Sequence, residues 1–371
     1  LVINSTRFER GPTCRRGAAG AQSVLASSRR SGRALRRGNP ADARPLTVKD
    51  VVSMHVFVVG ASGVLGRAAI PRLLAAGHQV TALARSPEKL LAVEKMGSRS
   101  LRGDILDGNG LARALSDQRP DVVVNLATAI PLRLKIDPRD WELNDRIRAT
   151  GTANLVRACE AAGVSLLVQE SVGYVCEPRG ADWIDEDSPL SAHPFLRATV
   201  EMERIVRGSA APGVLVRLGA LMSADSWHTQ QSIEALRRGT LPIIGDGSAY
   251  LSMVHAQDAA QAICRIVDSP GISAGKTYNV CDDAPAPMAE VIAFAARLVG
   301  GPRPKSVPAF LAKMAAGAVT VDVLAASYRM SDARIRADLD FAPAYPTYRE
   351  TWTQVAAALA NHVHAAARDL G

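Results

Sequence analysis

The sequence predicts an α/β protein, built on a doubly wound parallel sheet with a smaller α/β portion toward its C-terminus. Three observations predict this fold. Short apolar stretches at 55–60 and 121–127 are typical of strands that are buried on both faces. Helix-like stretches separate these strands. A glycine-rich turn joins the first strand to the first helix.

The elements alternate regularly from Met54 onward. The run HVFVVG predicts the first strand, residues 64–76 the first helix, and QVTALA the second strand. DVVVNLA and SLLVQE predict two more strands, and residues 145–163 have helical spacing that ends in a glycine. After about residue 210, GVLVRLG and KTYNV predict strands among alanine-rich helices and proline-rich loops. We therefore expect one domain over 54–210 and a second portion over 211–371 that is interleaved with it.

Residues 1–53 form a basic leader, for which we expect disorder. They carry 11 basic and 3 acidic residues, which accounts for the whole net charge of +8. Their arginine- and serine-rich composition fits an organellar transit peptide. Alternatively, Met54 is the natural start and the leader is upstream sequence. We favour the second interpretation, and with it a cytoplasmic protein.

The remainder of the chain excludes several classes of protein. From residue 54 onward, 33 basic and 33 acidic residues balance, so nothing there favours a nucleic-acid partner. No apolar run reaches the roughly 18 to 20 residues of a membrane span. The five cysteines are far apart and include no C-x-x-C pair, so we expect neither a disulfide framework nor a metal site.

The segment GASGVLG predicts a phosphate-binding turn. Gly60, Gly63 and Gly66 stand between a strand and a helix, and Ser62, Val64 and Leu65 complete the turn and the start of that helix. Glycine permits the tight turn, the approach of a diphosphate to the backbone and close packing of helix on strand. Free amide groups at the helix N-terminus then face the phosphates. The alternative is an ordinary glycine-rich turn that binds no dinucleotide.

The end of the second predicted strand bears on cofactor choice. An NAD site places an acidic residue there, whereas a 2′-phosphate favours arginine. The sequence has no acid at this point but has Arg85, followed by Ser86. Because a guanidinium can bind phosphate with two hydrogen bonds, we predict NADP(H) in preference to NAD(H). A solvated surface arginine is the alternative.

These residues resemble the extended, or atypical, short-chain dehydrogenase/reductases, also called NAD-dependent epimerase/dehydratases. The resemblance covers nearly all of 54–371 and rests on GASGVLG, GDILD, VVVNLAT, GTANLVRAC, VLVRLG and SMVHAQDAAQAI. It implies a Rossmann-like fold in which Asp104 and Ile105 flank the adenine and Leu126 and Ala127 line the ribose–nicotinamide channel. It also implies a substrate pocket formed mostly after residue 210, and a homodimer.

The sequence departs from this family at the expected catalytic pair. The family uses Tyr-x-x-x-Lys on a helix, because a nearby cation lowers the pKa of the phenol. If Glu203 matches the family's glutamate four residues past the lysine, the pair falls on Phe195 and Thr199. Phenylalanine has no acidic proton to donate, and threonine carries no positive charge. Arg148 also replaces an asparagine that the family usually has.

Three residues are candidates for the missing chemistry. Ser171 lies near the family's catalytic serine position, although a serine at a strand end also caps turns. Tyr174 follows three residues later and could face the nicotinamide, or could belong to the core or a pocket wall. His193 can titrate near neutral pH without a neighbouring cation, or lie on a loop surface.

The substrate is expected to be a small molecule. Phe195, Trp227 and Tyr250 are compatible with an apolar wall for a ring-containing substrate, and equally with core packing. The leading hypothesis is an NADP-dependent oxidoreductase or epimerase-like enzyme. The alternatives are a non-catalytic NADP(H)-binding sensor or structural protein, and a non-redox lyase or isomerase on the same fold.

Overall fold

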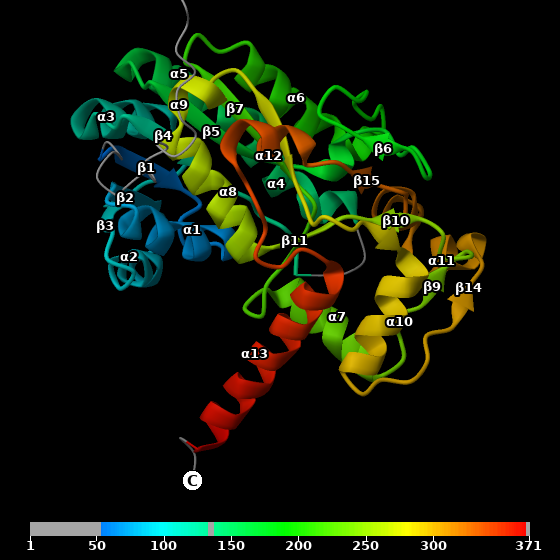
Figure 1. Cartoon of the computed structure of the whole chain (residues 1–371). Helices are drawn as coiled ribbons and strands as arrows, with labels where there is room; N and C mark the ends of the chain where they lie inside the picture. The colour runs from blue at the N-terminus through cyan, green and yellow to red at the C-terminus, as the bar shows by residue number, and fades with distance from the viewer. Residues whose placement is uncertain (1–52, 133–136, 369–371) are drawn as a thin grey trace, which may run out of the picture. The chain divides into compact units, whose positions relative to one another are not determined.

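The computed structural model describes residues 53–132 and 137–368. The leader that the sequence predicts therefore lies outside the described residues, apart from Ser53. The centre of the fold is a seven-stranded sheet in the order β12-β7-β5-β4-β1-β2-β3, in which every neighbouring pair is parallel (Figure 1). The predicted doubly wound parallel sheet is confirmed. Its strands are β1 (His55–Val59), β2 (Gln79–Ala84), β3 (Arg99–Arg102), β4 (Val122–Asn125), β5 (Leu166–Val172), β7 (Gly213–Leu218) and β12 (Thr277–Val280).

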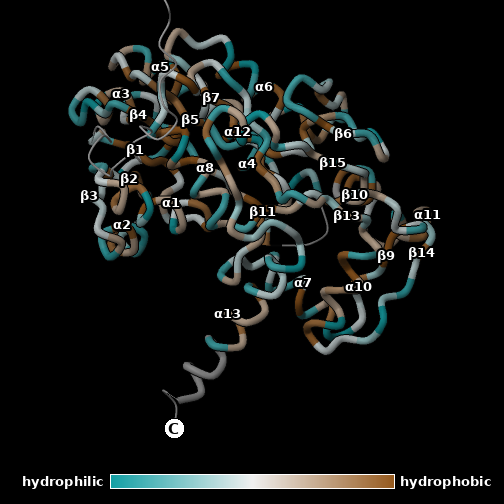
Figure 2. Tube along the Cα trace, in the orientation of Figure 1, coloured by the Kyte–Doolittle hydropathy of each residue, from teal (hydrophilic) through white to brown (hydrophobic). Residues whose placement is uncertain are grey.

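Helices cover both faces of this sheet, which explains why the central strands are apolar along their whole length. One face packs against α1 (Val64–Ala75), α2 (Pro87–Glu94) and α8 (Ala256–Asp268). The other packs against α3 (Gly108–Gln118), α5 (Thr152–Ala162) and α6 (Arg197–Arg207). Figure 2 shows hydrophobic colours on the central strands and mixed colours along the surrounding helices.

The helix predicted over 145–163 is interrupted. A 3₁₀ turn, η2 (Pro138–Trp141), leads into α4 (Glu142–Arg146), and the π-helical turn η3 (Ile147–Gly151) separates α4 from α5. The apolar spacing did not reveal this turn, because α4 has only five residues and is too short to show the change of helical phase that an inserted residue causes. Single π turns are frequent at functional sites, and this one holds Arg148.

Shorter elements follow the sheet strands on both sides of residue 210. After β5 come η4 (Gly173–Val175), β6 (Trp183–Ile184) and η5 (Pro194–Leu196), which leads into α6. Beyond β7, two small parallel pairs form, β8 (Ala220–Met222) with β11 (Met253–His255) and β9 (Ile243–Ile244) with β14 (Ser306–Val307). β15 (Arg329–Met330) runs parallel to β6, and β10 (Tyr250–Leu251) runs antiparallel to β13 (Ala286–Pro287).

A separate apolar cluster joins the later helices. It contains side chains of α7 (Trp227–Arg237), α10 (Met288–Leu298) and α13 (Tyr348–Arg368). The remaining elements are α9 (Pro270–Ser273), α11 (Ala309–Ala316), η6 (Thr320–Leu324) and α12 (Ala333–Leu339). Within the described part of the chain, no helix combines the length and apolar character that crossing a bilayer requires.

Candidate active site

The turn after β1 is built so that only glycine fits at two of its positions. Gly60 has a φ of +78°, and a Cβ there would lie 2.6 Å from the backbone nitrogen of Ala127. A Cβ on Gly66 would lie 2.6 Å from the carbonyl carbon of Ala61. The first glycine therefore lets the turn press against the end of β4, and the third lets α1 pack on the turn.

Gly63, the second glycine of the turn, leaves the N-terminus of α1 without a side-chain cap. Gly63 is exposed and stands at the N-cap, where no side chain caps the helix. The amide groups of Val64, Leu65 and Gly66 open the helix and have no acceptor within it. An uncapped helix end carries partial positive charge and free donors, which is the arrangement that binds a phosphate. The turn therefore fits the diphosphate of a dinucleotide.

An arginine braces this turn from the helix side. Arg67 Nη1 donates to the Ser62 carbonyl oxygen at 2.6 Å, and Arg67 Nη2 pairs with Asp225 Oδ2 at 2.7 Å. Asp225 lies just before α7, so the pair joins the turn to the portion that follows residue 210. Sequence reasoning missed Arg67, although a basic residue directly after the third glycine is a visible signal.

Arg85 follows directly after the last residue of β2 and is exposed. The next residue, Ser86, is the N-cap of α2 and hydrogen-bonds Glu88, which lowers the pKa of that exposed carboxyl. Gly103 donates its amide to the Ala84 carbonyl at 3.0 Å, which holds the ends of β2 and β3 together. Arg85 therefore stands at the carboxyl edge of the sheet.

The residues after β3 lie on the same edge. Asp104 Oδ1 accepts a hydrogen bond from the Leu106 amide at 3.0 Å, so this carboxylate stabilises its own turn. Ile105 is buried, and its side chain faces Gly151 of the π turn. Asn154 Nδ2 donates to the Ile105 carbonyl at 3.2 Å. Their predicted contacts with adenine stay predictions.

The end of β4 lies between the turn and β5. Leu126 is buried and donates its amide to the Val59 carbonyl at 2.9 Å, whereas Ala127 is partly exposed. Asn125 Oδ1 accepts from the Ala127 amide at 3.2 Å, and Asn125 Nδ2 donates to Gln169 Oε1 at 2.8 Å. This amide pair fixes the end of β4 against the end of β5.

The structure places Ser171 in a buried ionic network. Its hydroxyl donates to Glu203 Oε1 at 2.7 Å, and Arg217 Nη2 donates to Glu203 Oε2 at 2.8 Å. All three side chains are buried, and Arg207 adds a further ion pair at 2.8 Å. Burial opposes ionisation of Glu203, yet these donors hold its pKa below the ordinary value. The geometry favours a structural role for the Ser171 hydroxyl, and its predicted catalytic role stays a prediction.

The positions expected to hold the family's pair carry other contacts. Phe195 lies in η5 with its ring edge-on to Trp141 at 5.0 Å between centroids. Thr199 is buried in the first turn of α6. His193 precedes η5 and accepts the Phe195 amide on Nδ1 at 3.2 Å, so it acts as a cap. Whether the remaining imidazole nitrogen takes part in catalysis stays a prediction.

Tyr174 lies beside two buried charges that sequence reasoning did not connect with it. Arg148 and Glu170 are 4% and 8% exposed, and Arg148 Nη2 lies 3.6 Å from Glu170 Oε2. Tyr174, in the turn after β5, is partly exposed and its ring packs obliquely on Tyr328. Burial raises the pKa of Tyr174, Arg148 opposes that rise, and Glu170 adds to it. In the sequence, the acidic residue Glu170 near the end of a largely apolar strand was the feature that could have indicated this group of residues.

The other expected aromatic residues have separate partners. Trp227 packs edge-on against His228, and the guanidinium of Arg329 lies 4.8 Å from the centre of the Tyr250 ring. His255 caps α8 and hydrogen-bonds Gln354 at 2.8 Å. Whether Phe195, Trp227 and Tyr250 also border a substrate stays a prediction.

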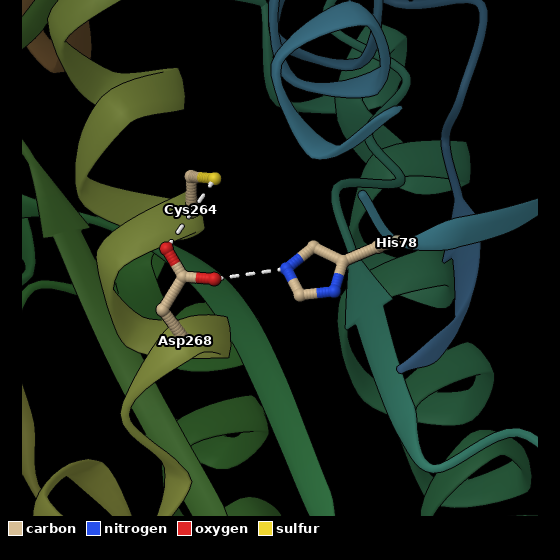
Figure 3. A group of neighbouring side chains, drawn as sticks. All are labelled: His78, Cys264 and Asp268. Carbon is tan, nitrogen blue, oxygen red and sulfur yellow. Dashed lines mark hydrogen bonds and ion pairs between the residues drawn. The ribbon is translucent and has the colours of Figure 1, made fainter. Parts of the chain in front are cut away.

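One further group could in principle hold a metal ion: His78, Cys264 and Asp268 (Figure 3). The Met54 amide donates to His78 Nδ1 at 3.3 Å, and His78 Nε2 lies 2.9 Å from Asp268 Oδ1. Both ring nitrogens are therefore in use. Burial raises the pKa of the Cys264 thiol to about 12, which disfavours the thiolate that metals bind. The group is best described as a junction between α8 and the start of β2.

Comparison with known proteins agrees with this geometry. The model of the NAD-dependent epimerase/dehydratase family matches residues 56–281. A 3-diazoavenalumate denitrifying reductase from a Streptomyces species is 33% identical over 306 residues, which cover 80% of this chain and 98% of that protein. A 2-alkyl-3-oxoalkanoate reductase of Stenotrophomonas maltophilia is 27% identical, covering 72% and 82%. A human epimerase family protein solved with NADPH has a similar fold, with a TM-score of 0.69, 21% identity and coverage of 82% and 99%.

Proposed function

The chain belongs to the NAD-dependent epimerase/dehydratase family, and on that premise we propose that it is an NADPH-dependent reductase of carbonyl compounds. It is an NAD(P)-dependent enzyme of the oxidoreductase or epimerase-like type that acts on a small molecule. The two relatives described above are named as reductases, and the name of the second specifies a 3-oxo acid. The second name favours reduction of a ketone that one carbon separates from a carboxyl group.

The observation that carries this proposal is the crowded glycine turn with its uncapped helix. Gly60 and Gly66 leave no room for a side chain, and Gly63 leaves the first amides of α1 facing outward. A dihydronicotinamide, when bound, supplies hydride to the substrate. The chain itself holds the diphosphate at the turn, orients the two halves of the dinucleotide along the carboxyl edge of the sheet, and excludes water.

The preference for NADPH rests on Arg85. It is exposed directly after β2, where the ribose of the adenosine half is expected, and no acidic residue occupies that strand end. A guanidinium attracts a phosphate and offers it two parallel hydrogen bonds. An NAD site would need a carboxylate in its place.

Arg85→Ala is expected to weaken NADPH binding roughly tenfold or more, because a charge-assisted hydrogen bond contributes about 1.5 to 3 kcal/mol. NADH binding should change less than about twofold on the same energy scale, because NADH lacks the phosphate. Isothermal titration calorimetry with both nucleotides measures this. Lys95→Ala, an exposed cation just after α2, is the matched control and should change neither affinity. Tighter binding of NADH by the unaltered protein would contradict the preference.

Turnover is tested with the full chain and NADPH, by following loss of the dihydronicotinamide absorbance. The probes are ethyl 2-methyl-3-oxobutanoate, which carries the 2-alkyl-3-oxo group named for the relative, a simple aldehyde and a nucleotide sugar. We expect oxidation of NADPH with the oxo ester. NADPH binding without turnover of any probe would instead favour a non-catalytic binding protein.

A homodimer also stays a prediction, which sedimentation measurements would test.

A further inference from the structure

Arg148, Glu170 and Tyr174 form what we call the β5 cluster, and its charges are poorly satisfied. The Arg148–Glu170 separation of 3.6 Å is too long for a good hydrogen bond. Glu170 Oε2 is inaccessible and has no hydrogen-bond partner among the described residues. Among the described residues, Arg148 Nη1 donates only to the sulfur of Met202, at 3.5 Å. Buried charges left in this state have a high energy, which points to a functional use.

The cluster lies where the nicotinamide half of the cofactor is expected. The diphosphate turn follows β1, and a dinucleotide crosses the carboxyl edge of such a sheet at the point where the strand order reverses. The adjoining strands on the other side are β4 and β5. Glu170 and Tyr174 belong to the end of β5 and the turn after it, and Gln169 Nε2 donates to the Glu170 carbonyl at 2.8 Å.

Three groups face the Tyr174 phenol. Arg148 acts from the π turn and stabilises the phenolate, Glu170 acts from β5 and opposes it, and the Tyr328 ring comes from the segment before β15. Among the residues that the structure describes, the Tyr174 hydroxyl makes no hydrogen bond, so its proton is not committed to a protein acceptor. Ser171 differs, because its hydroxyl already donates a hydrogen bond to Glu203.

We propose that Tyr174 is the proton donor of the reaction and that Arg148, as a positioning residue, supplies the cation that stabilises the phenolate. This inference rests on the proposed function. As hydride adds to the carbonyl carbon, the electron pair of the C=O π bond moves to oxygen, and Tyr174 Oη gives that oxygen its proton. The products are an alcohol, an oxidised nicotinamide and a phenolate beside Arg148, and the phenolate then takes up one proton from the solvent, which the overall reaction consumes.

Glu170 opposes the effect of Arg148 on the pKa of Tyr174. Burial raises the pKa of Glu170, and Arg148 opposes that rise. Burial together with Glu170 raises the pKa of Tyr174, so the phenol stays protonated before the reaction, which is the form that a reductase needs in its donor. Arg148 lies beside Met202, three residues after Thr199 on α6. The guanidinium of Arg148 therefore lies beside α6, the helix on which Thr199 stands where the family's lysine is expected.

The first test measures the phenol directly and needs no substrate. Tyrosine labelled with ¹³C at Cζ is titrated by NMR in the full chain, and Tyr174→Phe assigns the signal. Arg148→Met should raise the pKa of Tyr174 by about 1 unit or more, since a nearby opposite charge shifts a pKa by about 1 to 3 units. Arg148→Lys should preserve it and Glu170→Gln should lower it. Arg204→Met, an exposed arginine on α6, is the control.

The second test uses NADPH with ethyl 2-methyl-3-oxobutanoate. Tyr174→Phe should lower kcat about 100-fold or more while NADPH affinity stays unchanged. Arg148→Met should lower kcat and move the alkaline limb of the pH profile to higher pH, and Arg148→Lys should restore both. If Arg148→Met fails to fold, Glu170→Gln still tests the proposal, because it should move the alkaline limb of the pH profile to lower pH.

The two proposals fail in different ways. A phenol titration that is unaffected by Arg148 and Glu170, or Tyr174→Phe turnover within about twofold of the unaltered enzyme, would overturn the inference about the cluster. Absence of turnover by the unaltered enzyme, with the phenol titrating as expected, would overturn the proposed reductase function instead.

Discussion

Gly60→Ala is expected to abolish measurable NADPH binding and to lower the free energy of unfolding by about 2 to 5 kcal/mol. The φ of +78° disfavours any residue with a Cβ, by about 1 to 2 kcal/mol. The new Cβ would also lie 2.6 Å from the backbone nitrogen of Ala127, and overpacking of this kind costs about 1 to 3 kcal/mol. Neither backbone segment can move away without separating β1 from β4.

The matched control is Gly77→Ala. Gly77 has a φ of +91°, but nothing lies within 4 Å of the position its Cβ would take. The substitution isolates the backbone strain, so it should cost about 1 to 2 kcal/mol and leave NADPH affinity unchanged. Urea denaturation and calorimetry measure both variants. Equal losses of stability in the two variants would show that the contact with the end of β4 is unimportant.

Glu203→Gln is expected to destabilise the protein by about 3 to 5 kcal/mol, because it leaves the guanidinium of Arg217 buried without its counter-ion. The Ser171 hydroxyl would also lose a charged acceptor. Glu234→Gln is the control, since Glu234 forms an exposed pair with Arg238 at 2.7 Å and such pairs contribute less than about 1 kcal/mol. A loss below 1 kcal/mol on this scale for Glu203→Gln would contradict the structural role.

The same network predicts a pH dependence. Because the pKa of Glu203 is lower in the folded protein than its ordinary value, its ionisation stabilises the fold above the unfolded pKa, near about 4.3. This contribution is lost as the pH falls through the folded pKa. Urea titrations of the unaltered protein and of Glu203→Gln should therefore converge below about pH 4. A difference in stability that stays constant down to acid pH would contradict the assignment.

The strands and the cofactor turn could be predicted because their signals are local. An apolar run marks a strand that is buried on both faces, and the sheet confirms the predicted runs around β1, β2, β4, β5, β7 and β12. The glycine spacing of GASGVLG requires one backbone geometry, and Gly60 and Gly66 have it. The π turn at Ile147–Gly151 escaped prediction, because the five residues of α4 before it are too few to show a shift in the apolar pattern.

Local residue patterns were enough to predict the parallel sheet and the glycine turn, because both depend on residue types at fixed short spacing. Which polar groups meet depends on the tertiary structure. Ser171 meets Glu203 across 32 residues, and the neighbouring strands β5 and β7 set Ser171 directly opposite Arg217. Arg148 reaches Glu170 because a π turn brings a helix to the end of β5. Strand register and helix packing fix such pairs, and neither leaves a pattern within one segment of the chain.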